Sequence, residues 1–484
     1  MVKMRKPCFV KCPLLFLFIF LPLLSALAQD ALIKDLPPFE STDRILILAP
    51  HPDDETIGCA GVIQRSLKAG AQVKVVYLTS GDNNIFSILF YNPLLFPIKL
   101  ISLKHSDFVR LGKQRRQEAI EAMKILGMKE GDLTFLGYPD HGTDKMFLYY
   151  WGEKKPYSST FSGQHSVPYQ ESEDYKEEYK GDSILRQLKK IILDYKPTKI
   201  FVSHTADHNG DHWALYLYLQ VVLVDLLDEM PDPEVYPYLI HVPGWPTPHH
   251  YHPQMEMSLP PQHFFEDLVS IFDWRELRLT EEEIEKKHRA LLAYKSQTRV
   301  SAFYLLAFVR QNEIFGDLPL LRLKEQFSSQ IPDGGSYNFT TDNQWISFAV
   351  ADGNLLLKTV KPVELKSRVS YWFFIAGFRH GMYFGDMPNI VVRARNNRVD
   401  IYNTVLGDKT VNPEGTGITF GKDHVTLKIP LKILGDPDGM IFAFNSLNNR
   451  SFPPGYKAFR RILIQRGRPQ ENLEDLADKW GAFP

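Results

Sequence analysis

One stretch near the start of the chain joins a strand-like apolar run to side chains that bind metals. The run extends from Ile45 to Ala49 and ends at a proline. The residues that follow are Pro50, His51, Pro52, Asp53, Asp54 and Glu55. In open α/β sheets, ligands bind just outside the carboxyl ends of the strands. Imidazole and carboxylate together suit a zinc-type ion, which in catalytic sites has three protein ligands and one open position.

His51 and Asp54 are three residues apart on one tight turn and are the first candidate ligands. Asp53 points in a different direction from Asp54, so it is free to act as general base for a metal-activated water. The alternative interpretation is a solvated, acidic helix N-terminus, where Asp and Glu are favoured. If the metal interpretation holds, a third ligand must come from elsewhere in the chain.

A second polar cluster begins at the end of another strand-like segment, residues 199–204. The segment 204–212 contains His204, Asp207, His208, Asp211 and His212, and a helix-like pattern begins at Trp213. A lone histidine is more often structural than a metal ligand. Two such clusters at the ends of two strands favour a shared site, and we expect the third ligand in this segment.

The Ala49-Pro50-His51-Pro52-Asp53-Asp54-Glu55 motif resembles the signature of the LmbE-like (PIG-L) family of zinc-dependent N-acetylglucosaminyl deacetylases. Asp211-His212 is similar to the end of the second motif of that family. Two weaker similarities are the Arg115-Arg116-Gln117-Glu118 segment and the late helix that ends in Ser296-Gln297. The resemblance covers residues 43 to 310, approximately, and its first motif is the specific one.

This resemblance implies a zinc ion, or another divalent metal, held by His51, Asp54 and His212, with Asp53 as the general base. It also implies a second histidine that stabilises the developing oxyanion without binding the metal. His208 is the candidate for that role, although it lies four residues before His212 where the family has three. Gly210 can absorb the extra residue because glycine accepts unusual dihedral angles. His204 remains the rival.

The segments around these clusters alternate between strand-like and helix-like patterns, which predicts an α/β fold. Strand patterns at 73–78 and 133–137 and helix patterns at 110–127, 184–195 and 213–227 predict a Rossmann-like, mostly parallel sheet with helices on both faces. Asp82, Asp140 and His141 lie in loops after strands, and they are candidates for substrate contact together with Arg115. Plain turns and an exposed helix charge are the alternatives.

The second half of the chain has a different character. Helical patterns end near 327–336, and strand patterns with turn residues follow, which predicts a smaller all-β sandwich. We therefore expect a deacetylase-like domain over 40–326 and a β-sandwich over 335–484, and a chain ending near Gln330 is expected to fold. The sandwich faintly resembles carbohydrate-binding modules, and a structural appendage is the alternative. His249, His250 and His252 lie among prolines and are interpreted as loop residues.

Residues 1–28 are predicted to be a signal peptide. A basic beginning and the apolar run from Leu14 to Leu24 precede the Ala26-Leu27-Ala28 cleavage site. We expect an exported protein, periplasmic or extracellular, that starts at Gln29. An uncleaved membrane anchor is the alternative, although the run is shorter than the ~20 residues of a membrane span. Cys59 would then be the remaining cysteine, which excludes an intramolecular disulfide.

The chain has 56 Lys and Arg against 57 Asp and Glu, which does not favour a nucleic-acid partner. The apolar segment Ile85–Leu103 is interrupted by prolines and is interpreted as an insertion or lid, with lipid or membrane contact as the alternative.

The predicted function is an exported metal-dependent hydrolase that removes the N-acetyl group from an amino sugar in a glycan or glycoconjugate. The alternatives are an amidase for an N-acyl lipid or peptide, and a non-catalytic glycan-binding protein. The oligomeric state does not follow from the sequence.

Overall fold

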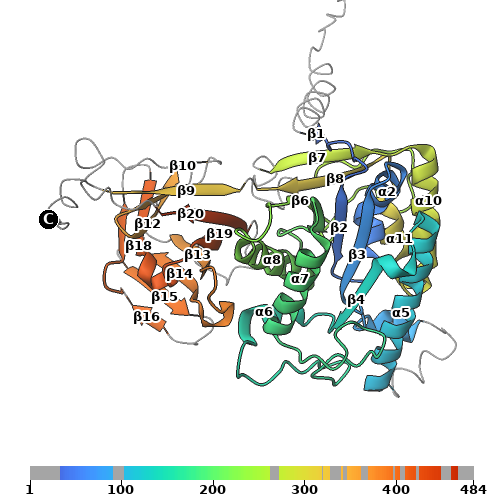
Figure 1. The fold of residues 1–484 in the computed structure, drawn as a ribbon, viewed down its shortest axis with the longest axis horizontal. Coiled ribbons are helices and arrows are strands. Elements are labelled where there is room, and N and C mark those ends of the chain that lie inside the picture. Colours follow the sequence, from blue (N-terminus) through green and yellow to red (C-terminus); the bar gives the residue numbers. More distant parts are fainter. Residues whose placement is uncertain are drawn as a thin grey trace, which may run out of the picture.

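The computed structural model contains two units side by side (Figure 1). It describes residues 33–90, 103–261, 272–318, 320–327, 340–341, 346–360, 369–395, 398–403, 409–411, 413–420, 424–448 and 459–466. The predicted signal peptide and residues 91–102 of the apolar segment lie outside the described residues.

An eight-stranded sheet forms the centre of the first unit, in the order β1-β7-β8-β6-β5-β2-β3-β4. Its strands are β1 (Ile33–Asp35), β2 (Arg44–Ala49), β3 (Gln72–Thr79), β4 (Leu133–Tyr138), β5 (Lys199–Ser203), β6 (Glu234–Tyr238), β7 (Asp273–Arg278) and β8 (Asn312–Asp317). From β6 to β4 every neighbouring pair is parallel, whereas β8 runs antiparallel to both β6 and β7. The predicted mostly parallel sheet is confirmed.

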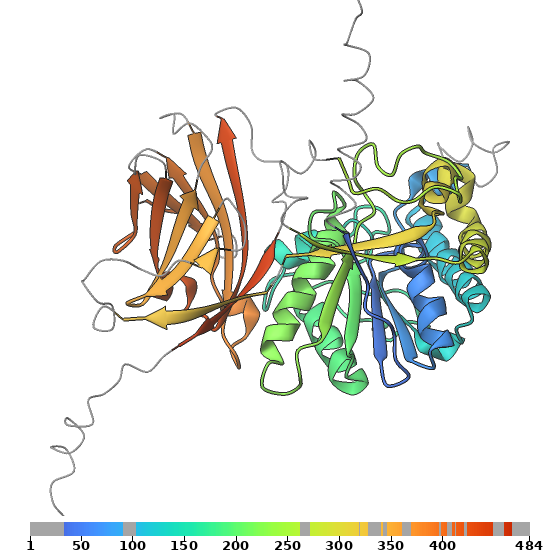
Figure 2. The same cartoon turned by 90° about the horizontal axis from the view of Figure 1, so that it is seen from above.

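Helices cover both faces of this sheet, as predicted (Figure 2). They are α2 (Asp54–Lys68), α3 (Ile85–Leu89), α5 (His105–Leu126), α6 (Thr143–Tyr149), α7 (Gly181–Tyr195), α8 (Gly210–Asp225), α10 (Glu281–Ala293) and α11 (Lys295–Leu305), with 3-10 turns at Glu130–Asp132 and Leu306–Phe308. Successive strand side chains point to opposite faces. Ile45 and Ile47 therefore join the core with α2, α5 and α10, whereas Leu46 and Leu48 join the core with α6, α7 and α8.

From its sequence, the segment 235–245 is predicted to be the last strand of the sheet together with its loop. Strand β6 confirms the strand, but its place as the last strand is wrong. Strands β7, β8 and the edge strand β1 extend the sheet beyond β6. These strands are short and rich in polar residues, so the apolar pattern of a buried strand is weak. In β8, Glu313 is buried because Lys287 of α10 pairs with it at 2.8 Å. Only the folded chain shows this pairing.

The second unit is a twelve-stranded sheet that curls into two facing layers. Its strands are β9 (Leu321–Gln326), β10 (Thr340–Thr341), β11 (Ile346–Ala351), β12 (Asn354–Val360), β13 (Val369–Phe378), β14 (Asn389–Arg395), β15 (Arg398–Asn403), β16 (Lys409–Val411), β17 (Gly417–Phe420), β18 (His424–Pro430), β19 (Gly439–Asn448) and β20 (Arg460–Gln465), with 3-10 turns at Phe384–Asp386 and Leu431–Leu434. The all-β half of the predicted fold is confirmed. Strand β9 lies within the predicted extent 40–326 of the first domain, but it pairs with β20 and β11 of the second sheet.

The two units share one hydrophobic core around helix α8. Phe374, Phe378 and Ile441 of the β unit belong to the same buried cluster as the apolar side chains of α8. The Trp213 and Phe459 rings stack at 6.1 Å. Helix α8 is apolar on all sides, with 13 of its residues buried, because it packs between the sheet of the first unit and the β unit.

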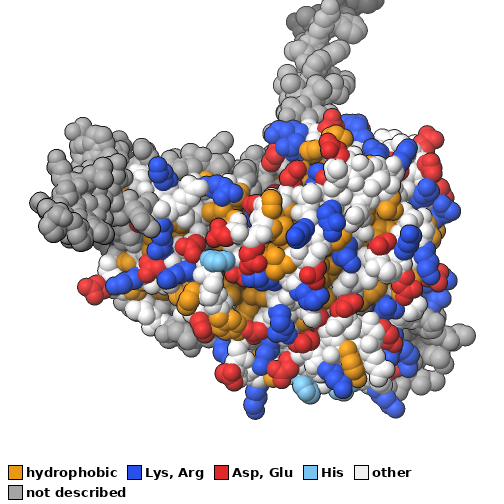
Figure 3. All heavy atoms as spheres, viewed as in Figure 1, with side chains coloured by type: hydrophobic (Ala, Val, Ile, Leu, Met, Phe, Trp, Pro, Cys, Tyr) orange, Lys and Arg blue, Asp and Glu red, His pale blue; other side chains and the backbone are white. Residues whose placement is uncertain are grey.

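Helix α10 begins with a capping box, in which Thr280 and Glu283 each accept a hydrogen bond from the backbone N–H of the other. On the face drawn in Figure 3, Lys and Arg side chains are interspersed with Asp and Glu. Within the described part of the chain, no helix combines the length and the apolar character needed to cross a bilayer.

Candidate active site

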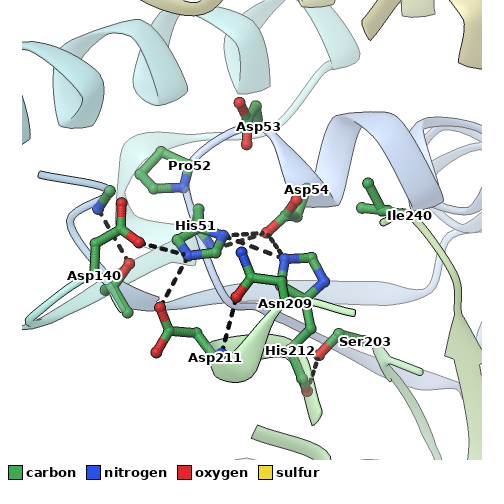
Figure 4. Close-up of polar contacts among 12 residues, drawn as sticks. His51, Pro52, Asp53, Asp54, Asp140, Ser203, Asn209, Asp211, His212 and Ile240 are labelled. Carbon is green, nitrogen blue, oxygen red and sulfur yellow. Dashed lines mark hydrogen bonds and ion pairs between the residues drawn. The ribbon is translucent and has the colours of Figure 1, made fainter. Parts of the chain in front are cut away.

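The turn after β2 brings His51 and Asp54 to the carboxyl edge of the sheet, and α8 brings His212 to the same point (Figure 4). All three side chains are buried. His51 Nδ1 lies 3.0 Å from Asp54 Oδ2, and His212 Nε2 lies 3.1 Å from the same oxygen. His212 Nε2 and His51 Nδ1 are 3.2 Å apart. These separations match the spacing of about 3.3 Å between ligand atoms that bond lengths of about 2.0 Å give in a tetrahedral zinc site.

The donor set therefore fits a zinc-type ion, as the sequence predicts for these residues. Burial opposes ionisation of Asp54, but the charge of His212 and the hydrogen bonds from both histidines outweigh it and hold its pKa well below the usual range. The Asp54 carboxylate is therefore ionised, as a metal ligand must be.

Asp53 lies beside this group and is held by Arg115 rather than by the two histidines. Arg115 Nη2 lies 3.0 Å from Asp53 Oδ2 and donates to the carbonyl of Pro52 at 2.6 Å. Nη1 donates to the carbonyl of Gly81 at 3.0 Å. Burial raises the pKa of Asp53 to about 8, and the charge of Arg115 counteracts part of that rise. Arg115, a predicted substrate contact, thus positions the candidate base.

A glycine makes this position of Arg115 attainable. A Cβ atom on Gly81 would lie only 2.3 Å from Arg115 Nη1, and the backbone there has a φ of +60°. Both conditions favour glycine over any other residue.

Glu55 fixes the backbone of Asp53, a role that the sequence did not suggest. Asp53 has a φ of 133°, which a residue with a side chain rarely adopts. Its N–H donates to Glu55 Oε2 at 3.1 Å. The hydroxyls of Thr56 and Tyr294 both donate to Oε1 of the same carboxylate, which is fully buried. Glu55 and Tyr294 thus hold the strained turn that directs Asp53 and Asp54 to different partners.

Asp207 organises the loop between β5 and α8. Its Oδ2 lies 3.1 Å from His212 Nδ1 and accepts the N–H groups of Ile240 and His241 at 3.1 and 2.9 Å. Its Oδ1 accepts the N–H of Asn209 at 2.9 Å. A carboxylate behind a metal-binding histidine fixes the orientation and tautomer of the ring. Asp207 is therefore a positioning residue, although the sequence alone gave it no role.

The opposite nitrogen of His51 faces two further carboxylates. His51 Nε2 lies 3.2 Å from both Asp140 Oδ1 and Asp211 Oδ2. Asp211 also accepts the backbone N–H of His141 at 2.6 Å and both the N–H and the hydroxyl of Thr143. These contacts tie the turn after β4 to the first residues of α8.

Three of the predicted substrate contacts therefore have partners within the protein. Asp82 accepts the N–H of Asp140 at 3.2 Å and the hydroxyl of Tyr169 at 2.9 Å. Asp140 in turn faces His51, and Arg115 faces Asp53. The side chain of His141 is 57 % exposed at the rim. Contact of these four residues with substrate stays a prediction.

The two histidines predicted as rivals for the oxyanion role lie in different environments. His204 is fully buried, its Nδ1 accepts the N–H of Ala206, and its ring packs on Phe272 and Trp274. Burial lowers its pKa to about 4. His208 is exposed, and its backbone N–H donates to the carbonyl of His241. Neither belongs to a metal-competent group among the described residues.

A third histidine, His241, lies beside the candidate ligands. Its ring centroid is 4.6 Å from that of His212, and it forms a metal-competent group with Asp207 and His212. Burial lowers its pKa to about 4, against the opposing charge of Asp207, so the imidazole is neutral. The sequence signal that could have identified His241 is its place just after a strand, like His51 and His204. Figure 4 shows the adjacent Ile240 on the His212 side of the cluster, away from Asp140.

Part of the chain is similar to known deacetylases. Residues 46–222 match the family model described as PIG-L: GlcNAc-PI de-N-acetylase. The chain is 34% identical over 101 residues to a 1D-myo-inositol 2-acetamido-2-deoxy-alpha-D-glucopyranoside deacetylase of Geodermatophilus obscurus, covering 21% of this chain and 31% of the relative. It is 33% identical over 105 residues to the deacetylase of the same name from Mycobacterium sp. strain KMS, covering 22% and 30%.

Among solved structures, the N,N'-diacetylchitobiose deacetylase from Pyrococcus horikoshii matches the chain with 18% identity and a TM-score of 0.32. That match covers 61% of this chain and 91% of the solved one. By contrast, the chain spans about a third of the length of the curated relatives that it matches.

Proposed function

Residues 46–222 match the PIG-L family model, and from that premise we propose that the protein hydrolyses the N-acetyl amide of an N-acetylated amino sugar. The supporting observation is the group made by His51, Asp54 and His212, whose ligand atoms lie 3.0–3.2 Å apart beside a separate carboxylate, Asp53. A divalent metal held by these three residues would supply a Lewis acid that acidifies water and polarises the amide carbonyl.

The residues around this group have distinct roles in the proposed reaction. Asp53 takes the proton of the attacking water as the new C–O bond forms, and returns it to the nitrogen as the C–N bond breaks. Acetate and a free amine are the products. Arg115 orients the Asp53 carboxylate through the 3.0 Å ion pair and favours its ionised form.

We assign stabilisation of the developing oxyanion to His241 rather than to His208 or His204. The His241 ring contacts His212 and is a neutral donor, whereas His204 is enclosed by aromatic rings. A positioned donor of this kind lowers the barrier by favouring the charge that appears only in the transition state.

Two variants test the proposed division of roles. Asp53→Asn keeps the size and hydrogen bonding of the side chain but removes the basic oxygen, so turnover should fall by roughly 10²–10⁴-fold while metal content holds. Asp54→Asn should lose the metal first and activity as a consequence. The measurements are metal per protein and acetate release from N-acetylated sugars, oligosaccharides and glycolipids. A metal-free Asp53→Asn beside a metal-loaded Asp54→Asn would reverse the two roles, and a wild-type protein that releases no acetate would refute the function.

We also propose that the protein is exported, from the basic beginning and apolar run of residues 1–28. Sequencing the N-terminus of the mature protein should give Gln29. A mature chain that still starts at Met1 and stays in the membrane fraction would contradict this proposal.

A further inference from the structure

Four aromatic side chains form a continuous strip that begins at the candidate metal ligand His212 and reaches the surface. This aromatic strip consists of His241, Tyr304, Phe303 and His249. His241 contacts His212, and its ring is nearly parallel to that of Tyr304, with centroids 6.2 Å apart and planes 13° from parallel. His249 lies 6.3 Å from Tyr304 and 6.0 Å from Phe303. The Phe303 side chain is 49 % exposed, while the other three are partly buried.

Hydrogen bonds to the neighbouring backbone fix the aromatic strip in position. The Tyr304 hydroxyl donates to the carbonyl of Ile240 at 2.6 Å, which ties α11 to the segment that carries His241. The N–H of His250 donates to the carbonyl of Phe303 at 2.6 Å. Arg310, only 1 % exposed, donates to the carbonyls of Pro248 and His252 on either side of His249. A surface fixed in this way loses little conformational entropy when a ligand binds.

The chemistry of the aromatic strip differs from that of the opposite wall of the site. The strip contains no Asp, Glu, Lys or Arg, whereas the wall beside His51 is formed by Asp140 and Asp211. The strip combines aromatic rings, of which Phe303 is half-exposed, with two imidazole side chains. A sugar ring has the matching character, with an apolar C–H face and hydroxyls at its edge. An acyl chain would be better matched by aliphatic side chains, since it can use none of the imidazole nitrogens.

We infer that the aromatic strip binds a further saccharide ring of the substrate, so that an N-acetylated oligosaccharide is preferred over the single sugar. The acetamido group would lie at the metal-competent residues, and the neighbouring ring would extend along Tyr304 to Phe303. This inference rests on the proposed deacetylase function and names the substrate class for the same site.

The experiment compares kcat/KM of the full-length protein on N-acetylglucosamine, its β-1,4-linked trimer and its octyl glycoside. Phe303→Ala removes the exposed ring, and the ratio of kcat/KM for the trimer over the single sugar should fall about 3- to 10-fold, the usual worth of one aromatic contact. Phe303→Trp keeps a flat ring and should keep the wild-type ratio. Leu292→Ala is the matched control, because Leu292 is 44 % exposed on α10 and lies outside the aromatic strip.

The outcomes separate this inference from the function on which it rests. An unchanged ratio in Phe303→Ala would overturn the assignment of the strip while leaving the deacetylase function intact. A larger loss with the octyl glycoside than with the trimer would also overturn it and would make a lipid chain the occupant. Failure of the wild-type protein to release acetate from any of the three compounds would refute the proposed function itself.

Discussion

The two turns that supply the metal-competent side chains are supported by different parts of the molecule. The first turn, residues 50–55, is fixed by its own strand and helix, by Glu55 of the same segment, and by Arg115 and Tyr294 of the first unit. The second, residues 204–212, leads into α8, which packs against the β unit. The backbone N–H of Phe459 donates to the hydroxyl of Thr205 in this turn at 2.9 Å. The first turn is therefore supported from within its own segment and the first unit, whereas the second turn is also supported by the β unit.

Removing the β unit should have the largest effect, because it strips α8 of one of its two packing surfaces. We expect a chain ending at Leu318 to be insoluble or to lack a cooperative unfolding transition. Each buried apolar side chain contributes roughly 1.5–3 kcal/mol, and the total stability of a domain is only about 5–15 kcal/mol. Solubility, thermal unfolding and metal content are the measurements. From the sequence alone, a chain ending near Gln330 is expected to fold. The shared core around α8 leads us to expect the opposite.

A single substitution in the β unit also tests whether that unit supports the second turn. Phe459→Ala in the full chain should lower the free energy of unfolding by about 3–5 kcal/mol and loosen the second turn before the first. For the truncation described above, a chain ending at Leu318 that folds and binds metal with wild-type affinity would show that α8 needs no support from the β unit.

His241→Ala should have the next largest effect, because it removes the proposed donor to the oxyanion. We expect kcat to fall about 10²–10³-fold with metal content unchanged. His208→Ala is the control and should change kcat only slightly, since its side chain is exposed. Steady-state kinetics and metal analysis on both variants decide the assignment. A large loss in His208→Ala beside a mild one in His241→Ala would restore His208 to the role predicted from the sequence.

Asp207→Asn tests how the second turn orients its ligand. The amide leaves His212 without a carboxylate behind its ring, so metal affinity should fall about 10- to 100-fold. Competition with a chelator of known affinity measures this change. Asp317→Asn is the matched control, since Asp317 accepts the Tyr216 hydroxyl and lies outside the metal-competent groups of the described residues. Equal metal affinity in Asp207→Asn and the wild type would remove Asp207 from the site.

Glu55→Ala tests the local support of the first turn. Without the carboxylate the strained backbone of Asp53 can relax, and we expect kcat to fall about 10-fold while KM and metal content hold, because the base moves but the ligands stay. Glu283→Ala is the control, because Glu283 caps α10 through Thr280 and should affect stability only. A parallel loss of metal in Glu55→Ala would mean that the turn holds Asp54 as much as Asp53.

The smallest effect concerns His204 and the pH dependence of stability. Burial lowers the pKa of His204 to about 4, whereas in the unfolded chain it titrates near 6.5. The unfolded state therefore takes up a proton first, and the stability contributed by the neutral ring is complete above pH 6.5 and is lost as the pH falls toward 4. His204→Gln should reduce the acid-induced fall in Tm by a few °C. Thermal unfolding at several pH values measures this slope, and an unchanged slope would contradict the buried neutral state.

The sequence alone determined the local features of this protein. The strand-turn-helix pattern around residues 45–55 identified His51, Asp53 and Asp54, and the motif pointed to the PIG-L family that the matched region supports. The parallel sheet, the helices on both faces and the all-β second half followed from periodicity. These features are predictable because they arise from residues within one or two elements, where pattern and chemistry coincide.

The tertiary structure decided which distant groups meet at the site. His241, Asp207 and Tyr294 lie in separate segments, and only the folded chain places them against His212 and Glu55. Strand β8 was not predicted from the sequence, because it carries a buried charged residue, Glu313. Lys287 from α10 compensates that charge in the folded protein. The sequence predicts a helix at 213–227 but not what it packs against, since an apolar helix packs equally well against a sheet or a second unit. Contacts of this kind depend on long-range packing, which periodicity along the chain does not encode.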